Sequence, residues 1–184
     1  FVLLAASQSV PTFDLLALLA VPLPHATQHA FLLLCLIGFG VKVPLVPLHT
    51  WLPQFALAAP GSLTALLVGL KLGAYGLIRF AIPLAPDAAQ DLHWLLAGLG
   101  IVTLIYGAVG ILAQSNLRVA LAYASICHVG LAVLGLAAFT AQGVQGAVSL
   151  LLSFSVATGG AFLLLEFLRQ RTGSTDIHSL GGAA

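Results

Sequence analysis

The sequence predicts an all-α polytopic membrane protein, and two observations carry this class. Of the 184 residues, 60% are hydrophobic and only 6% are charged, with a mean hydropathy of +1.12. Soluble domains contain about 25% charged residues. The apolar runs are also long enough for helices and too long for membrane β-strands. We therefore expect lipid as the main surroundings, and the net charge of +1 predicts no nucleic-acid partner.

The first part of the chain is expected to lie ahead of the first spanning helix. Residues 1–6 are expected to end a helix, and residues 7–12 to form a polar turn. The apolar run from Asp14 to Leu23 is too short to span, because a crossing needs about 20 residues, so it is expected at the interface. The chain opens inside an apolar run and contains no methionine. We expect an internal piece of a longer protein, with residues 1–184 forming a single transmembrane domain.

Apolar stretches of membrane-spanning length follow in order along the chain. They predict helices at about residues 29–50, 61–84, 92–113, 118–139 and 143–170. Lysine and arginine accumulate on the cytoplasmic side of membrane proteins. Arg118, Arg169 and Arg171 fall at the ends of two of these spans, which predicts that these ends share the cytoplasmic side. Asp87 and Asp91 fall on the opposite side.

The first span contains a predicted helix break. Its sequence reads Gly40-Val-Lys42-Val-Pro44-Leu-Val-Pro47-Leu-His49-Thr-Trp51-Leu-Pro53. Proline lacks a backbone N–H and clashes with the preceding turn, so the helix should break at Pro44 and Pro47. A lysine beside a broken helix inside a bilayer is costly and indicates an ion pathway. The alternative is that Lys42 extends to the membrane surface and that the prolines only end a helix.

Lys71 lies near the middle of the next span. It stands about ten residues from the start of the span, or about 15 Å at 1.5 Å per residue. Extension to the surface is therefore harder than for Lys42. Burial disfavours the charged form of a lysine, so its protonation can change when a neighbouring charge moves. Two lysines at mid-depth in consecutive helices indicate a proton relay.

The span at 118–139 adds a histidine at similar depth. Histidine titrates near neutral pH, which suits His128 to a relay, but a lone histidine among apolar residues is equally often a core residue. Tyr106, Tyr123 and Ser125 supply hydroxyl groups that can hold water or polarise their neighbours. The alternative is that these hydroxyls only bond between helices.

Other polar residues are expected to have no part in the relay. Glu166 is expected at the interface, paired with Arg169 or Arg171. Cys35 and Cys127 stand alone in apolar stretches, which favours small buried side chains over a disulfide or a metal site. The sequence has no CxxC, no pair of histidines at haem-ligand spacing and no GxGxxG after a strand. No redox centre or metal site is expected in this chain.

The run from Gly40 to Pro53 is similar to the signature of the antiporter-like membrane subunits of respiratory complex I, the proton-translocating NADH-quinone oxidoreductase. The stretches Gly69–Phe80, Leu117–Gly130 and Gln145–Ala147 continue the resemblance over nearly the whole chain. The Lys-Val-Pro…His-Thr-Trp-Leu-Pro form leans towards the M type of the family, the counterpart of mitochondrial subunit 4. The resemblance implies an antiporter-like bundle of about fourteen helices with a discontinuous helix. This chain would hold roughly the sixth to the eleventh, and a bacterial inner (plasma) membrane is its expected location.

The resemblance also implies roles for residues and partners. Lys42 matches the lysine at the break of the seventh helix, Lys71 the lysine of the eighth, and His128 a histidine on the central polar axis. The implied function is proton relay through these residues, driven by quinone reduction elsewhere in the complex. The chain would hold no cofactor, and NADH, flavin, iron–sulfur clusters and quinone would belong to partner subunits of the membrane complex. The expected supporting polar residues are His49, Tyr106, Arg118, Tyr123 and Ser125.

Three other interpretations stay open at this point. The chain can belong to a multisubunit cation/proton antiporter, which shares the fold, or to a membrane-bound hydrogenase. A purely structural bundle is the third, because relay positions can decay while a fold persists.

The chain also departs from the family pattern. Where relatives often read Trp-Leu-Pro-Asp-Ala-His, this chain has Gln54-Phe55-Ala56 after Pro53, which removes a carboxylate and an imidazole. Phe154 stands where many relatives carry a second axial histidine. Arg118 replaces the usual lysine, and Gln170 replaces a glutamate. These departures put the completeness of the relay in question and leave both lysines and His128 in place.

Overall fold

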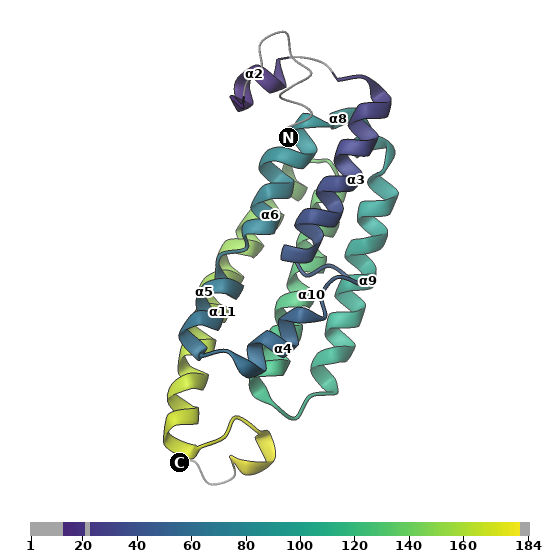
Figure 1. Cartoon of the computed structure of the whole chain (residues 1–184). Coiled ribbons are helices and arrows are strands. Elements are labelled where there is room, and N and C mark those ends of the chain that lie inside the picture. Colours follow the sequence, from purple (N-terminus) through teal and green to yellow (C-terminus); the bar gives the residue numbers. More distant parts are fainter. Residues whose placement is uncertain (1–12, 21–22, 181–184) are drawn as a thin grey trace.

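The computed structural model describes residues 13–20 and 23–180, and its regular elements are helices arranged as a long bundle (Figure 1). The expected helix end and turn in residues 1–12 lie outside the described part. Four stretches, Gly61–Leu84, His93–Leu112, Leu117–Ala137 and Ala141–Thr172, are long and apolar enough to cross a membrane. The elements are α2 Leu15–Leu19, α3 His25–Lys42, α4 Trp51–Ala58, α5 Gly61–Gly69, α6 Leu72–Gly76, the π-helical η1 Leu77–Ala81, α7 Ile82–Leu84, α8 Pro86–Asp91, α9 His93–Leu112, α10 Leu117–Ala137, α11 Ala141–Thr172 and the 3₁₀-helical η2 Ile177–Ser179. The all-α membrane class is confirmed.

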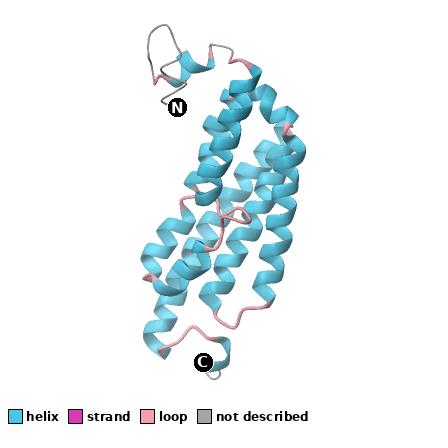
Figure 2. Ribbon diagram, turned by 45° about the vertical axis from the view of Figure 1, so that its right-hand side comes forward, coloured by secondary structure: helices cyan, strands magenta, loops and turns pink. Residues whose placement is uncertain are grey.

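The predicted break between α3 and α4 is present, and Figure 2 shows its loop about halfway along the bundle. Pro44 has no N–H to offer the carbonyl of Gly40, so that carbonyl accepts from the backbone N–H of Leu45 at 2.9 Å. The carbonyl of Val41 accepts instead from the indole N–H of Trp51 at 2.7 Å. Both of these carbonyls therefore keep a hydrogen-bond partner at the break, as a membrane interior requires.

A second break occurs at Lys71, between α5 and α6, and the sequence did not indicate it. Lys71 has a left-handed backbone with φ of 45°. This conformation costs a non-glycine residue about 1–2 kcal/mol. Further along, one π-helical turn precedes Pro83, whose ring would clash with the carbonyl of Arg79 in a regular α-helix. The stretch at 61–84 is thus helical in pieces.

Two of the long helices, α10 and α11, begin at side chains that cap them. The side chain of Asn116 caps α10 by accepting from the N–H of Arg118, and Thr140 caps α11 by accepting from the N–H of Gly143. Gly173 ends α11 in the left-handed conformation, with φ of 78°. α10 packs against α4 and α11 packs against α5, so these helices contact segments that adjoin the two breaks.

Gln28 joins α3 to α8 at the end of the bundle opposite Arg118. Its side chain is buried, donates to the Asp87 carboxylate at 3.0 Å and accepts from the Asp87 backbone N–H at 3.1 Å. Two exposed histidine–aspartate contacts flank it, His25 with Asp87 at 4.0 Å and His29 with Asp91 at 3.3 Å. These contacts hold the start of α3 against α8, and the break lies at the opposite end of α3.

We expect Gly73→Ala to destabilise the protein by about 1–3 kcal/mol, because it overpacks a backbone contact between the two breaks. A methyl group on Gly73 would lie 2.8 Å from the nitrogen of Val43 and 2.9 Å from the carbonyl oxygen of Phe39. Neither backbone atom can move away without shifting α3. Thermal unfolding of the purified protein measures the effect. Gly38→Ala on α3 is the matched control, since a methyl group there meets nothing within 4 Å. Equal stability of the two variants would contradict the contact.

Candidate functional site

A small cavity lies where the two helix breaks meet. Its volume is about 20 Å³, and its lining includes Lys42, Lys71 and Ser125 among apolar neighbours. A cavity of about 10–15 Å³ is enough for one water molecule when polar partners surround it. The two lysines predicted from the sequence therefore border a single water-sized space, although they are 29 positions apart along the chain.

Lys71 points from its left-handed break into this cavity. Its ammonium donates a hydrogen bond to the hydroxyl of Ser125, a fully buried residue on α10. The same ammonium lies 5.4 Å from the centroid of the Phe154 ring on α11, within the range of a cation–π contact. The strained backbone thus carries a charged group held between two other helices, and strain of this kind clusters at functional sites.

Lys42 is the last residue of α3 and borders the cavity from the other side. Its Nζ lies 5.8 Å from the centroid of the Trp51 ring, at the start of α4. The side chain is exposed in the described part of the chain. Trp51, at the start of α4, therefore contacts the end of α3 twice, with its indole N–H on the Val41 carbonyl and its ring face under the lysine.

His128 lies next to this group, against the ring of Phe154. Its imidazole stacks on Phe154, with ring centroids 3.7 Å apart and an interplanar angle of 15°. Its Nδ1 lies 2.8 Å from the carbonyl oxygen of Ala124, one turn earlier on α10, and donates to it if that nitrogen carries the proton. Neither His128 nor Phe154 lines the cavity.

The remaining ring-bearing candidates form a separate cluster. His49, on the loop of the first break, is 4% exposed and meets Tyr106 of α9 edge-on, with centroids 4.5 Å apart. The ring centroid of Tyr106 in turn lies 6.2 Å from the ring centroid of Tyr123 on α10. Within the described residues Nδ1 of His49 has no hydrogen-bond partner. The loop also donates the backbone N–H of Val46 to the hydroxyl of Thr103 at 3.1 Å.

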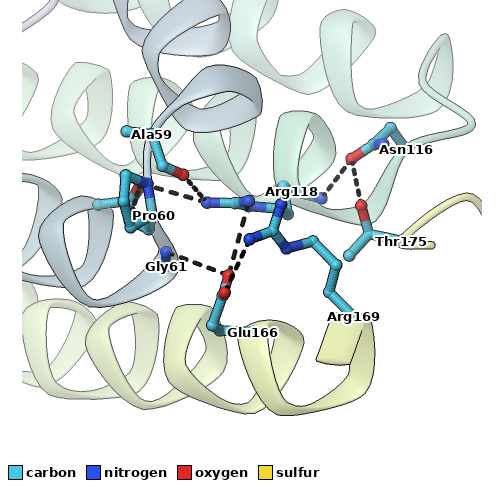
Figure 3. Close-up of polar contacts among 9 residues, drawn as sticks. Ala59, Pro60, Gly61, Asn116, Arg118, Glu166, Arg169 and Thr175 are labelled. Atoms are coloured by element: carbon cyan, nitrogen blue, oxygen red, sulfur yellow. Dashed lines mark hydrogen bonds and ion pairs between the residues drawn. The ribbon is translucent and has the colours of Figure 1, made fainter. Parts of the chain in front are cut away.

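Arg118 lies at one end of the bundle, apart from the cavity, in a buried polar cluster (Figure 3). Arg118 is 1% exposed, and its side chain donates to the carbonyl of Ala59 at the end of α4 and lies 3.7 Å from the Glu166 carboxylate. The same carboxylate accepts from the backbone N–H of Gly61 at 3.1 Å and from Arg169 at 2.9 Å. The expected pairing of Glu166 with Arg169 is confirmed, and its contact with buried Arg118 is an addition.

The structure thus sorts the predicted residues into three groups. Lys42, Lys71 and Ser125 meet at the cavity, with His128 adjacent through Phe154, whereas the His49 cluster and Arg118 stand apart. In the sequence Phe154 is visible only as a departure from the family pattern, and no sequence signal indicates its contacts with Lys71 and His128. Among the described residues no group of three or more histidine, cysteine, aspartate or glutamate side chains is placed to hold a metal.

Comparisons with known proteins agree with one another. The family model described as "NADH:quinone oxidoreductase/Mrp antiporter, TM" matches residues 1–184. The chain is 42% identical to NAD(P)H-quinone oxidoreductase chain 4 3 of Trichormus variabilis over 181 residues, covering 97% of this chain and 34% of that protein. It is 35% identical to NADH-quinone oxidoreductase subunit M of Rickettsia typhi over 179 residues, covering 95% of this chain and 36% of that one.

A solved structure matches as well. Respiratory complex I from Thermus thermophilus with bound NADH contains a chain similar to this one, with a TM-score of 0.88 and 40% sequence identity. The match covers 95% of this chain and 37% of that chain. This chain therefore spans about a third of the length of the relatives it matches.

Proposed function

Because this multi-pass membrane chain belongs to the NADH:quinone oxidoreductase/Mrp antiporter family, we propose that it is part of a proton-translocating membrane subunit of a NADH:quinone oxidoreductase. The relatives named above are quinone oxidoreductase chains, and the matched structure is a respiratory complex I. Other membrane subunits of the complex are its partners. The membrane is the bacterial inner membrane, since bacterial relatives are among those matched.

The observation that supports relay is the cavity that Lys42 and Lys71 share. A proton on Lys71 can pass to Lys42 through one water molecule in that space, and the Ser125 hydroxyl holds the amine in place. Like charges around one site disfavour each other's charged form, so a proton arriving at one lysine favours release from the other. The chain's part in the enzyme is thus to move protons, with the redox groups (NADH, flavin, iron–sulfur clusters and quinone) held by partner subunits.

A cation/proton antiporter is the second candidate, because the matching family description includes the Mrp antiporter. The same lysine pair serves an antiporter equally well. Sequence identity favours the first candidate, since the relatives that are 42% and 35% identical to this chain carry quinone oxidoreductase names.

Purification of the full-length chain with its bound partners separates the two functions. We expect the isolated complex to reduce quinone with NADH and, in vesicles, to move protons only while NADH is oxidised. The measurement is NADH absorbance together with the quench of a pH-sensitive dye. Proton movement that follows an imposed sodium gradient without NADH would assign the chain to an antiporter, and hydrogen-dependent activity would assign it to a hydrogenase.

A further inference from the structure

The polar path at the cavity stops at Lys71 and Ser125. His128 is only three residues beyond Ser125 on α10, on the same side of that helix. The cavity does not reach it, however, and its imidazole is covered by the Phe154 ring at 3.7 Å. The same ring contacts the Lys71 ammonium at 5.4 Å. Phe154 therefore touches the two proton-carrying groups that the water-sized cavity does not join.

We propose that Phe154 is an insulating residue that keeps water from joining Lys71 to His128 and so interrupts proton transfer between them. The inference rests on the proposed proton relay and adds a control point to it. Proton transfer needs a continuous chain of hydrogen-bonding groups, and a phenyl ring offers neither a donor nor an acceptor. The relay is thus closed at this point until the ring turns away from His128.

The ring is half-buried and contacts two ionisable side chains, the Lys71 ammonium and the His128 imidazole. The groups that would meet in the vacated space are the Lys71 ammonium and the His128 imidazole. A space the size of a phenyl ring, bordered by such polar partners, holds water readily. Truncation of this one side chain is therefore expected to produce a wet connection.

Passive proton leak in the assembled complex tests the proposal. Vesicles containing the complex with the full-length chain receive a pH jump without NADH, and an enclosed dye reports the decay of the gradient. We expect Phe154→Ala to speed the decay several-fold relative to wild type, because a water path stays open. Phe154→Leu keeps an apolar plug and is expected to decay at the wild-type rate. Phe167→Ala on α11, whose ring is exposed, controls for loss of an aromatic group.

A double variant, Phe154→Ala with Lys71→Ala, shows whether the leak passes through the relay. We expect the double variant to return to the wild-type decay rate. An unchanged decay in Phe154→Ala with NADH–quinone activity intact overturns the proposal, as does an equal leak in the double variant. Failure of the proposed function looks different, because Lys71→Ala alone would then leave NADH-driven proton translocation at the wild-type level.

Discussion

Lys71→Ala is expected to reduce proton translocation through this chain to background while quinone reduction continues. The lysine borders the water-sized cavity together with Ser125 and donates to its hydroxyl, and no other amine in the described residues contacts that hydroxyl. Alanine keeps the helix break but offers no exchangeable proton. The measurement is NADH oxidation and dye quenching recorded together in vesicles that contain the full-length protein.

Lys71→Arg distinguishes proton transfer from a fixed positive charge. A guanidinium does not deprotonate in proteins, so arginine keeps the charge and the hydrogen-bond donor but cannot release a proton. We expect this variant to fail in translocation as alanine does. Lys71→Gly also removes the amine, but glycine adopts the left-handed conformation of this position without cost. It therefore separates loss of the amine from any disturbance of the backbone, and we expect it to fail in translocation as alanine does. Normal translocation in Lys71→Arg would show that the lysine acts as a fixed charge and would end its assignment to the relay.

The two helix breaks differ in how far the sequence predicts them. The break after Lys42 follows from the local chemistry of Pro44, which removes one N–H and forces the carbonyls of α3 to find other partners. The break at Lys71 has no proline beside it. Its left-handed backbone coincides with the close contact of Gly73 against Val43, a tertiary contact that no local pattern specifies. Propensity therefore predicts the first break and tertiary packing determines the second.

The same distinction applies to the candidate site. Depth along a predicted helix was enough to single out Lys71 and His128, because membrane thickness converts residue number into height. Height does not specify which side of a helix faces which neighbour. The stacking of Phe154 on His128 depends on the rotation of α10 and α11 about their axes, and so do the contacts of Arg118 with α4 and α11. These rotations are set by packing across the bundle.

Glu166→Gln is expected to destabilise the protein by about 3–5 kcal/mol, the cost of leaving one partner of a buried ion pair without its counter-charge. Arg118 is 1% exposed, its Nε already lacks a partner within the described residues, and its guanidinium cannot lose its proton. Among the described residues, Glu166 supplies the only carboxylate in an ion pair with Arg118, at 3.7 Å. Glutamine keeps one acceptor oxygen for the Gly61 N–H at the start of α5, the helix that leads to Lys71, so the change mainly removes the charge that faces Arg118.

The midpoint of thermal unfolding of the purified protein in detergent measures this effect. Asp91→Asn is the matched control, because it makes the same change of acid to amide in an exposed pair with His29 and is expected to cost less than about 1 kcal/mol. The double variant Arg118→Met with Glu166→Leu is expected to recover most of the lost stability, since replacing both members of a buried pair by apolar residues is often neutral. If Glu166→Gln unfolds at the same temperature as Asp91→Asn, the carboxylate does not compensate the buried charge. A double variant no more stable than Glu166→Gln would show that the hydrogen bonds to Ala59 and Gly61, rather than the charge pair, hold this end of the bundle.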